Sequence, residues 1–267
     1  MEVHFINVGP GNMVLIIIPD SKIIINDCNI PDENEDRVLS YVKNQIGKSG
    51  IDIFINSHRD ADHMRGIQKL ENEFGIKEIW DCGVAGTTTD STEYSQYMSL
   101  KREKGKEVEP LRTHSFGDCL LRVMNGKNAD LKEPNEQSLV IKLEYKGSGI
   151  MLPGDTNYKS WKEFILPKYS DTKISSSILL ASHHGSLSFF DDPEDTKNYY
   201  IDHIKKLKPF LTVYSVGDND THPDEKAVKL YEKYSLGYDE NKVKTLKTNY
   251  HGTIKFEFKE KGASTVS

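Results

Sequence analysis

The strongest chemical signal in the chain lies in the short segment Ser57–His63, directly after the predicted strand Ile51–Ile55. This segment places four potential metal ligands close together: His58, Asp60, Asp62 and His63. Imidazole nitrogens and carboxylate oxygens suit Zn²⁺, Mn²⁺ or iron. A strand end that leads into a tight loop can point such side chains into one cavity, so the segment predicts a metal site. The alternative is a surface turn rich in Asp and His.

Two later segments carry the same residue types at the same kind of position. Leu152–Thr156 ends a predicted strand and contains Asp155, and Ala181–Ser186 follows the strand Ser177–Leu180 and contains His183 and His184. A Gly-Asp turn is a weak signal by itself. Because neighbouring strand ends can face one cavity, the three segments together predict a single metal centre.

In this order, the HxDxDH, GD and HHGS segments resemble the metallo-β-lactamase fold superfamily, in particular the hydrolase domain of ComEC/Rec2-like competence proteins. Further segments are similar to the start motif and the Ile-Asp-Thr-Gly, Ser-Val-Gly and Gly-His-Pro elements of that family: Phe5–Asn12, Ile24–Cys28, Ser215–Gly217 and Thr221–Pro223. The likeness extends over nearly the whole chain. It implies an α/β fold, an αββα sandwich, as a single domain over residues 1–260, with a dinuclear metal site at one edge. Residues 261–267 are small and polar, and we expect a disordered tail there.

The resemblance also implies roles for single residues. His58 and Asp60 would hold one metal ion, Asp62, His63 and His184 would hold the other, and Asp155 would bridge the two. His183 would face the substrate, and His222 would lie at the pocket rim or supplement the ligands. Two alternatives stay open: the two adjacent histidines could exchange roles, and His222 could be the final ligand.

The chain also departs from the family pattern. Asp60 replaces the second His of many members, as in the competence-type branch. The segment Pro134–Ser138 stands where many relatives carry a further His, and its Asn135 can offer only a neutral oxygen. Asn7, Pro10 and Asn12 replace the Asp, Gln and Asp of the start motif.

Two divalent ions, Zn²⁺ or Mn²⁺, held a few Å apart can activate a shared hydroxide and stabilise charge on a phosphate. Three carboxylates with at most three imidazoles favour Mn²⁺ or a mixed site. We therefore expect a phosphodiesterase or nuclease that acts on DNA, RNA or a small nucleotide through a metal-bound hydroxide. His183, as general acid or phosphate binder, and Asp62 are the predicted catalytic residues. The predicted substrate-binding residues are Ser186, His222 and Asn135, although Ser186 could equally be a helix N-cap.

Two other functions fit the same residues. A protein with weakened motifs could keep the fold and act as a binding or regulatory partner, with the polar segment Gly83–Thr113 as its docking element. A hydrolase of another ester, such as a lactone or thioester, is the second. The basic clusters Lys101–Lys106 and Lys205–Lys208 are more typical of solvated helix faces than of phosphate tracks.

Charge and cysteine content limit the setting in which the protein works. The 267 residues include 35 Lys and Arg against 41 Asp and Glu, a net charge of -6, so a polyanion must be held locally by metal or a basic patch. Three cysteines without a CxxC count against a disulfide framework. No apolar run approaches the ~20 residues of a membrane span, and no signal peptide is evident, so we expect a cytoplasmic protein without membrane contact.

The elements that must position these residues follow from hydrophobic periodicity. Strands are predicted at Val3–Asn7, Met13–Ile18, Ile23–Asn26, Ile51–Ile55, Glu78–Trp80, Cys119–Met124, Ser138–Tyr145, Gly149–Leu152, Ser177–Ala181, Leu211–Val216, Lys244–Lys247 and Gly252–Phe258. Helices are predicted at Glu35–Ile46, Arg65–Phe74, Ser91–Glu103, Asn157–Leu166, Tyr199–Leu207 and Glu225–Tyr234. This order predicts two β-rich halves with outer helices, packed as one domain.

Overall fold

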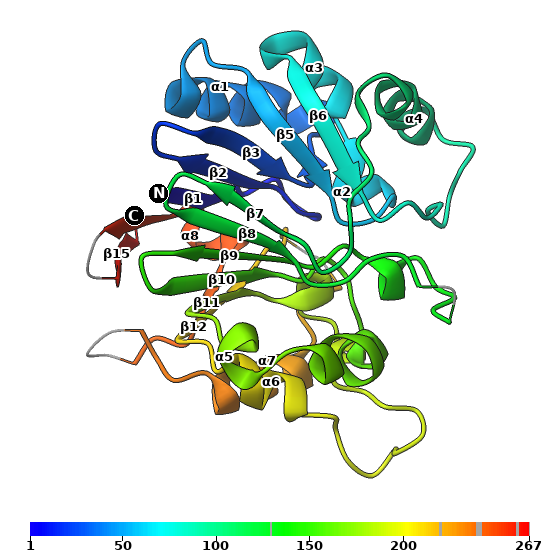
Figure 1. The fold of residues 1–267 in the computed structure, drawn as a ribbon, viewed down its shortest axis with the longest axis vertical. Coiled ribbons are helices and arrows are strands. Elements are labelled where there is room, and N and C mark those ends of the chain that lie inside the picture. Colours follow the sequence, from blue (N-terminus) through cyan, green and yellow to red (C-terminus); the bar gives the residue numbers. More distant parts are fainter. Residues whose placement is uncertain (129, 219–220, 239–241, 260–261, 267) are drawn as a thin grey trace.

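The computed structural model describes residues 1–128, 130–218, 221–238 and 242–259, together with the backbone of 262–266. Two seven-stranded sheets pack face to face, and helices cover the outer face of each (Figure 1). The strand orders are β15-β14-β1-β2-β3-β5-β6 and β13-β12-β11-β10-β9-β8-β7. The predicted αββα sandwich is therefore confirmed.

The first sheet contains seven strands and is covered by three helices. The strands are β1 (Glu2–Phe5), β2 (Val14–Ile18), β3 (Lys22–Asn26), β5 (Ile51–Asn56), β6 (Ile76–Asp81), β14 (Ile254–Lys259) and β15 (Gly262–Val266). The covering helices are α1 (Glu35–Ile46), α3 (Ile67–Phe74) and α4 (Thr92–Lys104). The short elements β4 (Cys28–Asn29), η1 (Asp32–Asn34) and α2 (Ala61–Met64) belong to the same half.

The second sheet has shorter helices on its outer face. Its strands are β7 (Thr113–Phe116), β8 (Cys119–Val123), β9 (Ile141–Tyr145), β10 (Ser148–Leu152), β11 (Ile178–Leu180), β12 (Leu211–Tyr214) and β13 (Thr245–Lys247). The helical elements of this half are η2 (Asn135–Gln137), the π-helix η3 (Ser160–Ile165), η4 (Leu166–Lys168), α5 (Asp171–Ile174), η5 (Ser182–Gly185), η6 (Leu187–Phe189), α6 (Asp202–Leu207), α7 (Glu225–Tyr234) and α8 (Thr248–His251).

Strand β5 shows how apolar side chains build the layers. Ile53 and Ile55 lie in the cluster between the two sheets, whereas Ile51 and Phe54 lie in the cluster under α1, α3 and α4. A parallel strand that is buried on both faces needs this nearly continuous apolar sequence. The polar residues that follow it at position 57 and beyond therefore mark the end of the apolar strand, although Ser57 and His58 remain buried.

The parallel strands set the position of the loops that carry the polar motifs. Strand β5 is parallel to β3 and β6, and β11 is parallel to β10 and β12. The loops that follow β5, β10, β11 and β12 therefore leave the carboxyl ends of parallel strands. Ligand sites of open α/β sheets form at this kind of edge.

Several local features differ from the sequence-based prediction. The helix expected at Asn157–Leu166 is a π-helix over Ser160–Ile165, and the Asn157 side chain ahead of it accepts hydrogen bonds from the backbone N–H groups of Lys159 and Ser160. The elements β7, α5 and α8 were not predicted. Instead of a frayed end, Gly262–Val266 form β15 through antiparallel pairing with β14; residues 261 and 267 lie outside the described part. No helix of the described residues is long and apolar enough to cross a membrane.

Candidate metal centre

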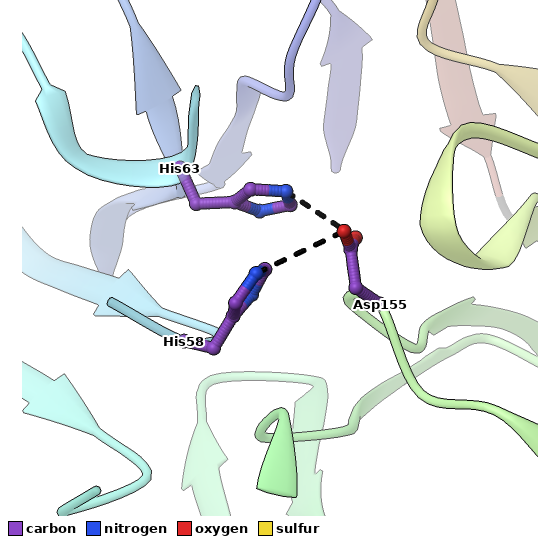
Figure 2. A group of neighbouring side chains, drawn as sticks. All are labelled: His58, His63 and Asp155. Atoms are coloured by element: carbon purple, nitrogen blue, oxygen red, sulfur yellow. Dashed lines mark ion pairs between the residues drawn. The ribbon is translucent and has the colours of Figure 1, made fainter. Parts of the chain in front are cut away.

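Loops from both sheets bring the predicted ligands to one edge of the sandwich. One set of potential ligand atoms comes from His58, His63 and Asp155, and a second from Asp62, His63 and His184; within each set all atoms lie within 4.8 Å of one another. Figure 2 shows His58 and His63 from one side converging on Asp155 from the other. The grouping of residues that are far apart in the sequence was predicted from the three motifs.

The two imidazoles at the centre of the site face each other through their Nε2 atoms. His63 Nε2 lies 3.3 Å from His184 Nε2. His184 Nδ1 must carry a hydrogen, because it donates to the carbonyl oxygen of Ser215 at 2.9 Å. His63 Nδ1 likewise donates to the carboxylate of Asp27 at 3.0 Å. In the neutral rings both Nε2 lone pairs are directed at one position, which either a proton on one ring or a bound cation must occupy.

His58 presents a third such lone pair. The Ser57 hydroxyl donates to Asp27 Oδ2 at 2.9 Å, so its oxygen is free to accept from His58 Nδ1 at 3.1 Å. His58 Nε2 is therefore unprotonated in the neutral ring, and among the described residues this buried atom has no hydrogen-bond partner. It lies 3.7 Å from Asp60 Oδ2 and 3.8 Å from Asp155 Oδ2. A buried nitrogen without a partner requires an explanation, and a bound cation would supply one.

Asp27 fixes the orientation of these rings and was not among the predicted site residues. It is fully buried after β3 and accepts hydrogen bonds from Ser57 N at 2.6 Å and Asn12 Nδ2 at 3.1 Å, besides the Ser57 hydroxyl and His63. A carboxylate on the far nitrogen of a metal-binding histidine fixes its tautomer and raises its basicity. The sequence signal was an Asp directly after a predicted strand, the same feature that identified Asp155.

Close backbone contacts hold Asp155 against the first motif. Its backbone N–H donates to Ser138 Oγ at 3.1 Å, and the Leu139 N–H donates to the Ser57 carbonyl at 2.7 Å. A Cβ on Gly154 would lie 2.7 Å from the Ser57 Cβ, and the φ of Gly154 is +57°. Both features require glycine, so the Gly-Asp pair brings the carboxylate close to the first motif.

The HHG turn has an uncommon backbone conformation. His183 and His184 have φ values of 48° and 54°, in the left-handed region, and Gly185 follows at 90°. The Ser182 hydroxyl, which donates to the Thr156 carbonyl at 2.6 Å, and the His183 N–H, which donates to the Gly154 carbonyl at 3.1 Å, hold the turn in place. Consecutive non-glycine residues in this region cost energy and are concentrated at functional sites.

Comparisons with known proteins identify the fold. No family model matches the chain, and no curated protein is similar to it in sequence. Among solved structures, the metallo-β-lactamase fold protein YhfI from Bacillus subtilis matches 93% of this chain and 98% of its own, with a TM-score of 0.53 and 13% identity. Igni18, a metallo hydrolase from Ignicoccus hospitalis, matches 97% and 100%, with a TM-score of 0.54 and 15% identity. The chain has the metallo-β-lactamase fold.

A third similar structure belongs to an enzyme with a different chemistry. CmlA from Streptomyces venezuelae, a diiron β-hydroxylase, has a TM-score of 0.54 and 13% identity, and the match covers 93% of this chain but 52% of CmlA. Structures similar to this chain thus include both a metallo hydrolase and a β-hydroxylase. The reaction must be argued from the residues of this chain.

Within this metallo-β-lactamase fold, the predicted ligands lie at different depths. The side chains of His58, His63, His184 and Asp155 are at most 8% exposed, whereas Asp60 and Asp62 are 18% and 43% exposed. Asp60 contacts His58 but belongs to neither set of mutually close ligand atoms, because its Oδ1 accepts from the Thr87 N–H at 2.8 Å and the Thr87 hydroxyl at 2.9 Å. Asp62 lies on the open side of the site, with Oδ2 3.3 Å from His184 Nε2.

The other predicted site residues surround this centre at greater distance. His183 Nε2 lies 3.7 Å from Asp155 Oδ2, and the His183 and His222 rings are 5.2 Å apart. The Ser186 hydroxyl accepts the Ser188 N–H at 3.3 Å and caps η6, which confirms the N-cap alternative. Asn135 opens η2 and is in none of the contacts that join the ligands described here. Of the two adjacent histidines, His184 is the one whose Nε2 meets Asp62 and His63.

The charges of the cluster oppose the cost of burial. Burial lowers the pKa of His63, but the charges of Asp155, Asp62 and Asp27 outweigh it and hold this pKa well above its usual value. Burial raises the pKa of Asp155, and the neighbouring His63, His184 and His58 bring it well below its usual range. The pKa of His58 is lowered, first by burial and then by His63. Asp155 is therefore ionised and His58 neutral at neutral pH, the forms that bind metal.

The spacing of the donors fits divalent cations. Ligands about 2.1 Å from a tetrahedral cation lie roughly 3.4 Å apart. The Nε2 of His63 lies 3.2 Å from Asp155 Oδ1, 3.3 Å from His184 Nε2 and 3.7 Å from Asp62 Oδ2. The residues present therefore fit a metal ion without rearrangement of the loops.

Proposed function

We propose that this chain is a metal-dependent hydrolase of phosphodiesters with a dinuclear centre. The observation that carries the proposal is the pair of facing Nε2 atoms of His63 and His184, both with Nδ1 committed as a donor and both beside carboxylates. Once His63 loses its second proton, both Nε2 lone pairs are directed at one position beside carboxylates, which is what a metal ion requires. The fold, shared with a metallo hydrolase, agrees with this proposal.

The proposed centre divides the ligands into two groups that share one carboxylate. His58 and Asp60 would hold the first ion, Asp62, His63 and His184 the second, and Asp155 both. Asp155 supports a bridging role because its Oδ1 faces His63 and its Oδ2 faces His58. Three carboxylates offset much of the charge of two dications and favour Mn²⁺ or a mixed site over two Zn²⁺. Ions bound there would activate water and neutralise charge on a phosphate.

The residues on the open side supply the remaining chemistry. Asp62 is 43% exposed, so a substrate at the second group of ligands touches its carboxylate. His183 is 29% exposed, and Ser188 Oγ lies 3.4 Å from its Nδ1, which leaves Nε2 directed toward Asp155. In this position Nε2 can protonate the leaving oxygen of the substrate or hold a phosphate. His222, beside His183, extends the same rim.

Two finer assignments belong to this proposal. Asp60 at the position of a second histidine supports membership of the competence-type branch of the superfamily. Three free cysteines, Cys28, Cys82 and Cys119, support a reducing compartment such as the cytoplasm.

The decisive experiment measures metal content and substrate preference on one preparation. We expect about two divalent ions per chain by elemental analysis, and hydrolysis of bis(p-nitrophenyl) phosphate that chelation abolishes and Mn²⁺ restores. p-Nitrophenyl acetate and a lactone serve as comparison substrates. Hydrolysis of these esters without diesterase activity contradicts the assigned substrate class. A chain that binds no metal overturns the proposal, and bound iron with oxygen-dependent turnover favours chemistry of the CmlA kind.

A further inference from the structure

A cleft of about 430 Å³ lies between α4 and the second sheet, outside the metal centre. Its size falls within the roughly 300–1,000 Å³ of small-molecule sites. Four lining residues are cations, Lys101, Arg102, Lys106 and Lys127, and two are acids, Asp81 and Glu107. Three of these cations come from the basic cluster that looked like a solvated helix face in the sequence. The structure folds that cluster over a cavity.

Some cations of the cleft already form ion pairs with acidic side chains, and others do not. Asp81 is held by Arg59 Nε at 2.8 Å and by Lys101 Nζ at 3.2 Å, so its charge is already offset. Lys106 pairs with Glu78 at 2.6 Å.

Arg102 and Lys127 are exposed, and neither side chain has an ion pair or hydrogen bond among the described residues. Arg102 on α4 and Lys127 after β8 come from separate parts of the chain, and they outnumber Glu107, the one lining acid that no Lys or Arg of the described residues pairs with, so the cleft attracts an anion.

The remaining wall of the cleft is apolar. Met98, Val108 and Leu139 line it beside the cationic rim. A bare inorganic anion would make no use of this surface, whereas a nucleotide places a sugar and base beside its phosphate. The combination therefore favours a nucleotide over a simple anion.

Short links connect the cleft to the metal centre. Gly83 lines the cleft, and the Thr87 N–H, four residues later, donates to Asp60 Oδ1. Four residues span at most roughly 14 Å. On the other wall, the N–H of Leu139 donates to the carbonyl of Ser57, the residue before His58. Neighbouring units of a short oligonucleotide can therefore occupy both places.

We propose that this cleft binds one nucleotide of a single-stranded oligonucleotide while an adjacent phosphodiester lies at the metal centre. Binding of a nucleotide is inferred from the cleft alone. The position of the adjacent phosphodiester rests on the proposed function. It assigns to the segment Gly83–Thr113 a role in substrate binding. It also explains how a chain of net charge -6 binds a polyanion, because the cationic side chains of the cleft attract it locally.

The test measures binding of fluorescein-labelled hexathymidylate to the whole chain in EDTA, so that metal does not contribute. Charge reversal in Arg102→Glu/Lys127→Glu is expected to weaken binding at least tenfold. It should also reduce the slope of log K against log salt by roughly 1 to 1.5, since each contact to a single strand contributes about 0.7. The matched control Lys48→Glu/Lys229→Glu changes the net charge equally, at exposed positions outside the cleft lining, and should bind as the unaltered chain does.

Three results overturn the cleft: an unaltered chain that does not bind the probe, cleft and control variants that weaken it equally, or a cleft variant that binds normally. Thymidine 5′-monophosphate should compete with the probe, and equal competition by inorganic phosphate contradicts the nucleotide assignment. Metal titration of the same preparations separates the two proposals. If the chain binds the probe through the cleft but takes up no metal, only the proposed metal centre is refuted. If diesterase activity depends on metal but the cleft variant binds the probe normally, only the proposed cleft is refuted.

Discussion

A shared carboxylate and a terminal imidazole contribute differently to a dinuclear centre. Asp155 directs one oxygen toward His63 and the other toward His58, so its charge acts on both cation positions. Without it, two dications a few Å apart repel each other in a site that water screens poorly. His58 touches only one position.

We therefore predict that Asp155→Ala loses both metal ions, whereas His58→Ala loses mainly one. Elemental analysis after gel filtration measures the stoichiometry, and circular dichroism checks that both variants are folded. Equal metal retention in the two variants would count against the bridging role of Asp155.

His183 lies beside the centre without belonging to either set of close ligand atoms. We predict that His183→Ala keeps metal content near that of the unaltered chain while turnover of bis(p-nitrophenyl) phosphate falls by ~10²-fold or more, the usual effect of a lost general acid. A histidine that only orients a ligand would lower metal affinity as well. Metal content and rate measured on one preparation decide: if both fall together, His183 belongs to the metal site.

Helix α6 carries a buried histidine whose neutral form is built into the packing of that helix. His203 Nε2 donates to the Phe189 carbonyl at 2.6 Å, and its Nδ1 accepts the Ile204 N–H at 2.9 Å. Protonation would destroy the acceptor, and burial lowers the pKa of His203 to about 3. In the unfolded chain the ring has its ordinary pKa of about 6.5. The folded state therefore loses stability as the pH falls below that value.

Between pH 6.5 and 4.5 the predicted loss in the free energy of unfolding that is due to His203 is about 2 kcal/mol, at about 1.4 kcal/mol per pH unit. His203→Gln should be less stable than the unaltered chain at pH 7, and this deficit should shrink by about that amount at pH 4.5. Urea unfolding in EDTA at both pH values measures it, with the exposed His251→Gln as control. An unchanged deficit would show that His203 does not titrate in this range.

At the scale of elements, hydrophobic periodicity predicted the long helices but not the local details of the backbone. Helices α1 and α7 have the predicted bounds, Glu35–Ile46 and Glu225–Tyr234, because each has an apolar face over several turns. The π-helix Ser160–Ile165 differs from the predicted helix in its backbone hydrogen-bond pattern, a detail that hydrophobic periodicity does not contain.

The candidate site shows the same division between local and long-range information. The clusters at 58–63, 155 and 183–184 could be identified because each follows a strand and combines ligand types. Asp27 was missed, because its role depends on contacts with Ser57 and His63, about 30 residues away in sequence. The cleft beside α4 was missed because Arg102 and Lys127 line one cavity only in the folded chain.

The whole molecule is held together partly at the site, since its ligands come from both sheets. His58, Asp60, Asp62 and His63 follow β5 of the first sheet, whereas Asp155 and His184 follow β10 and β11 of the second. These side chains bring carboxylates and imidazole nitrogens from both sheets to the same edge of the sandwich. Bound metal therefore adds ligand bonds between two layers that otherwise meet through apolar packing and a few hydrogen bonds, such as that from the Leu139 N–H to the Ser57 carbonyl.

Metal should accordingly stabilise the whole sandwich rather than one loop. At a free concentration of about 1,000 times Kd, a ligand of the folded state adds about 4 kcal/mol, and for a chain of this size that raises Tm by roughly 10 °C. We predict a single unfolding transition that shifts upward by this amount when Mn²⁺ is added to the EDTA-treated chain, measured by calorimetry. Asp155→Ala, which removes the carboxylate shared between the sheets, should show almost no shift. A shift of equal size in that variant, or a transition that splits so that only part of the heat moves, would mean that the metal binds elsewhere than between the two sheets.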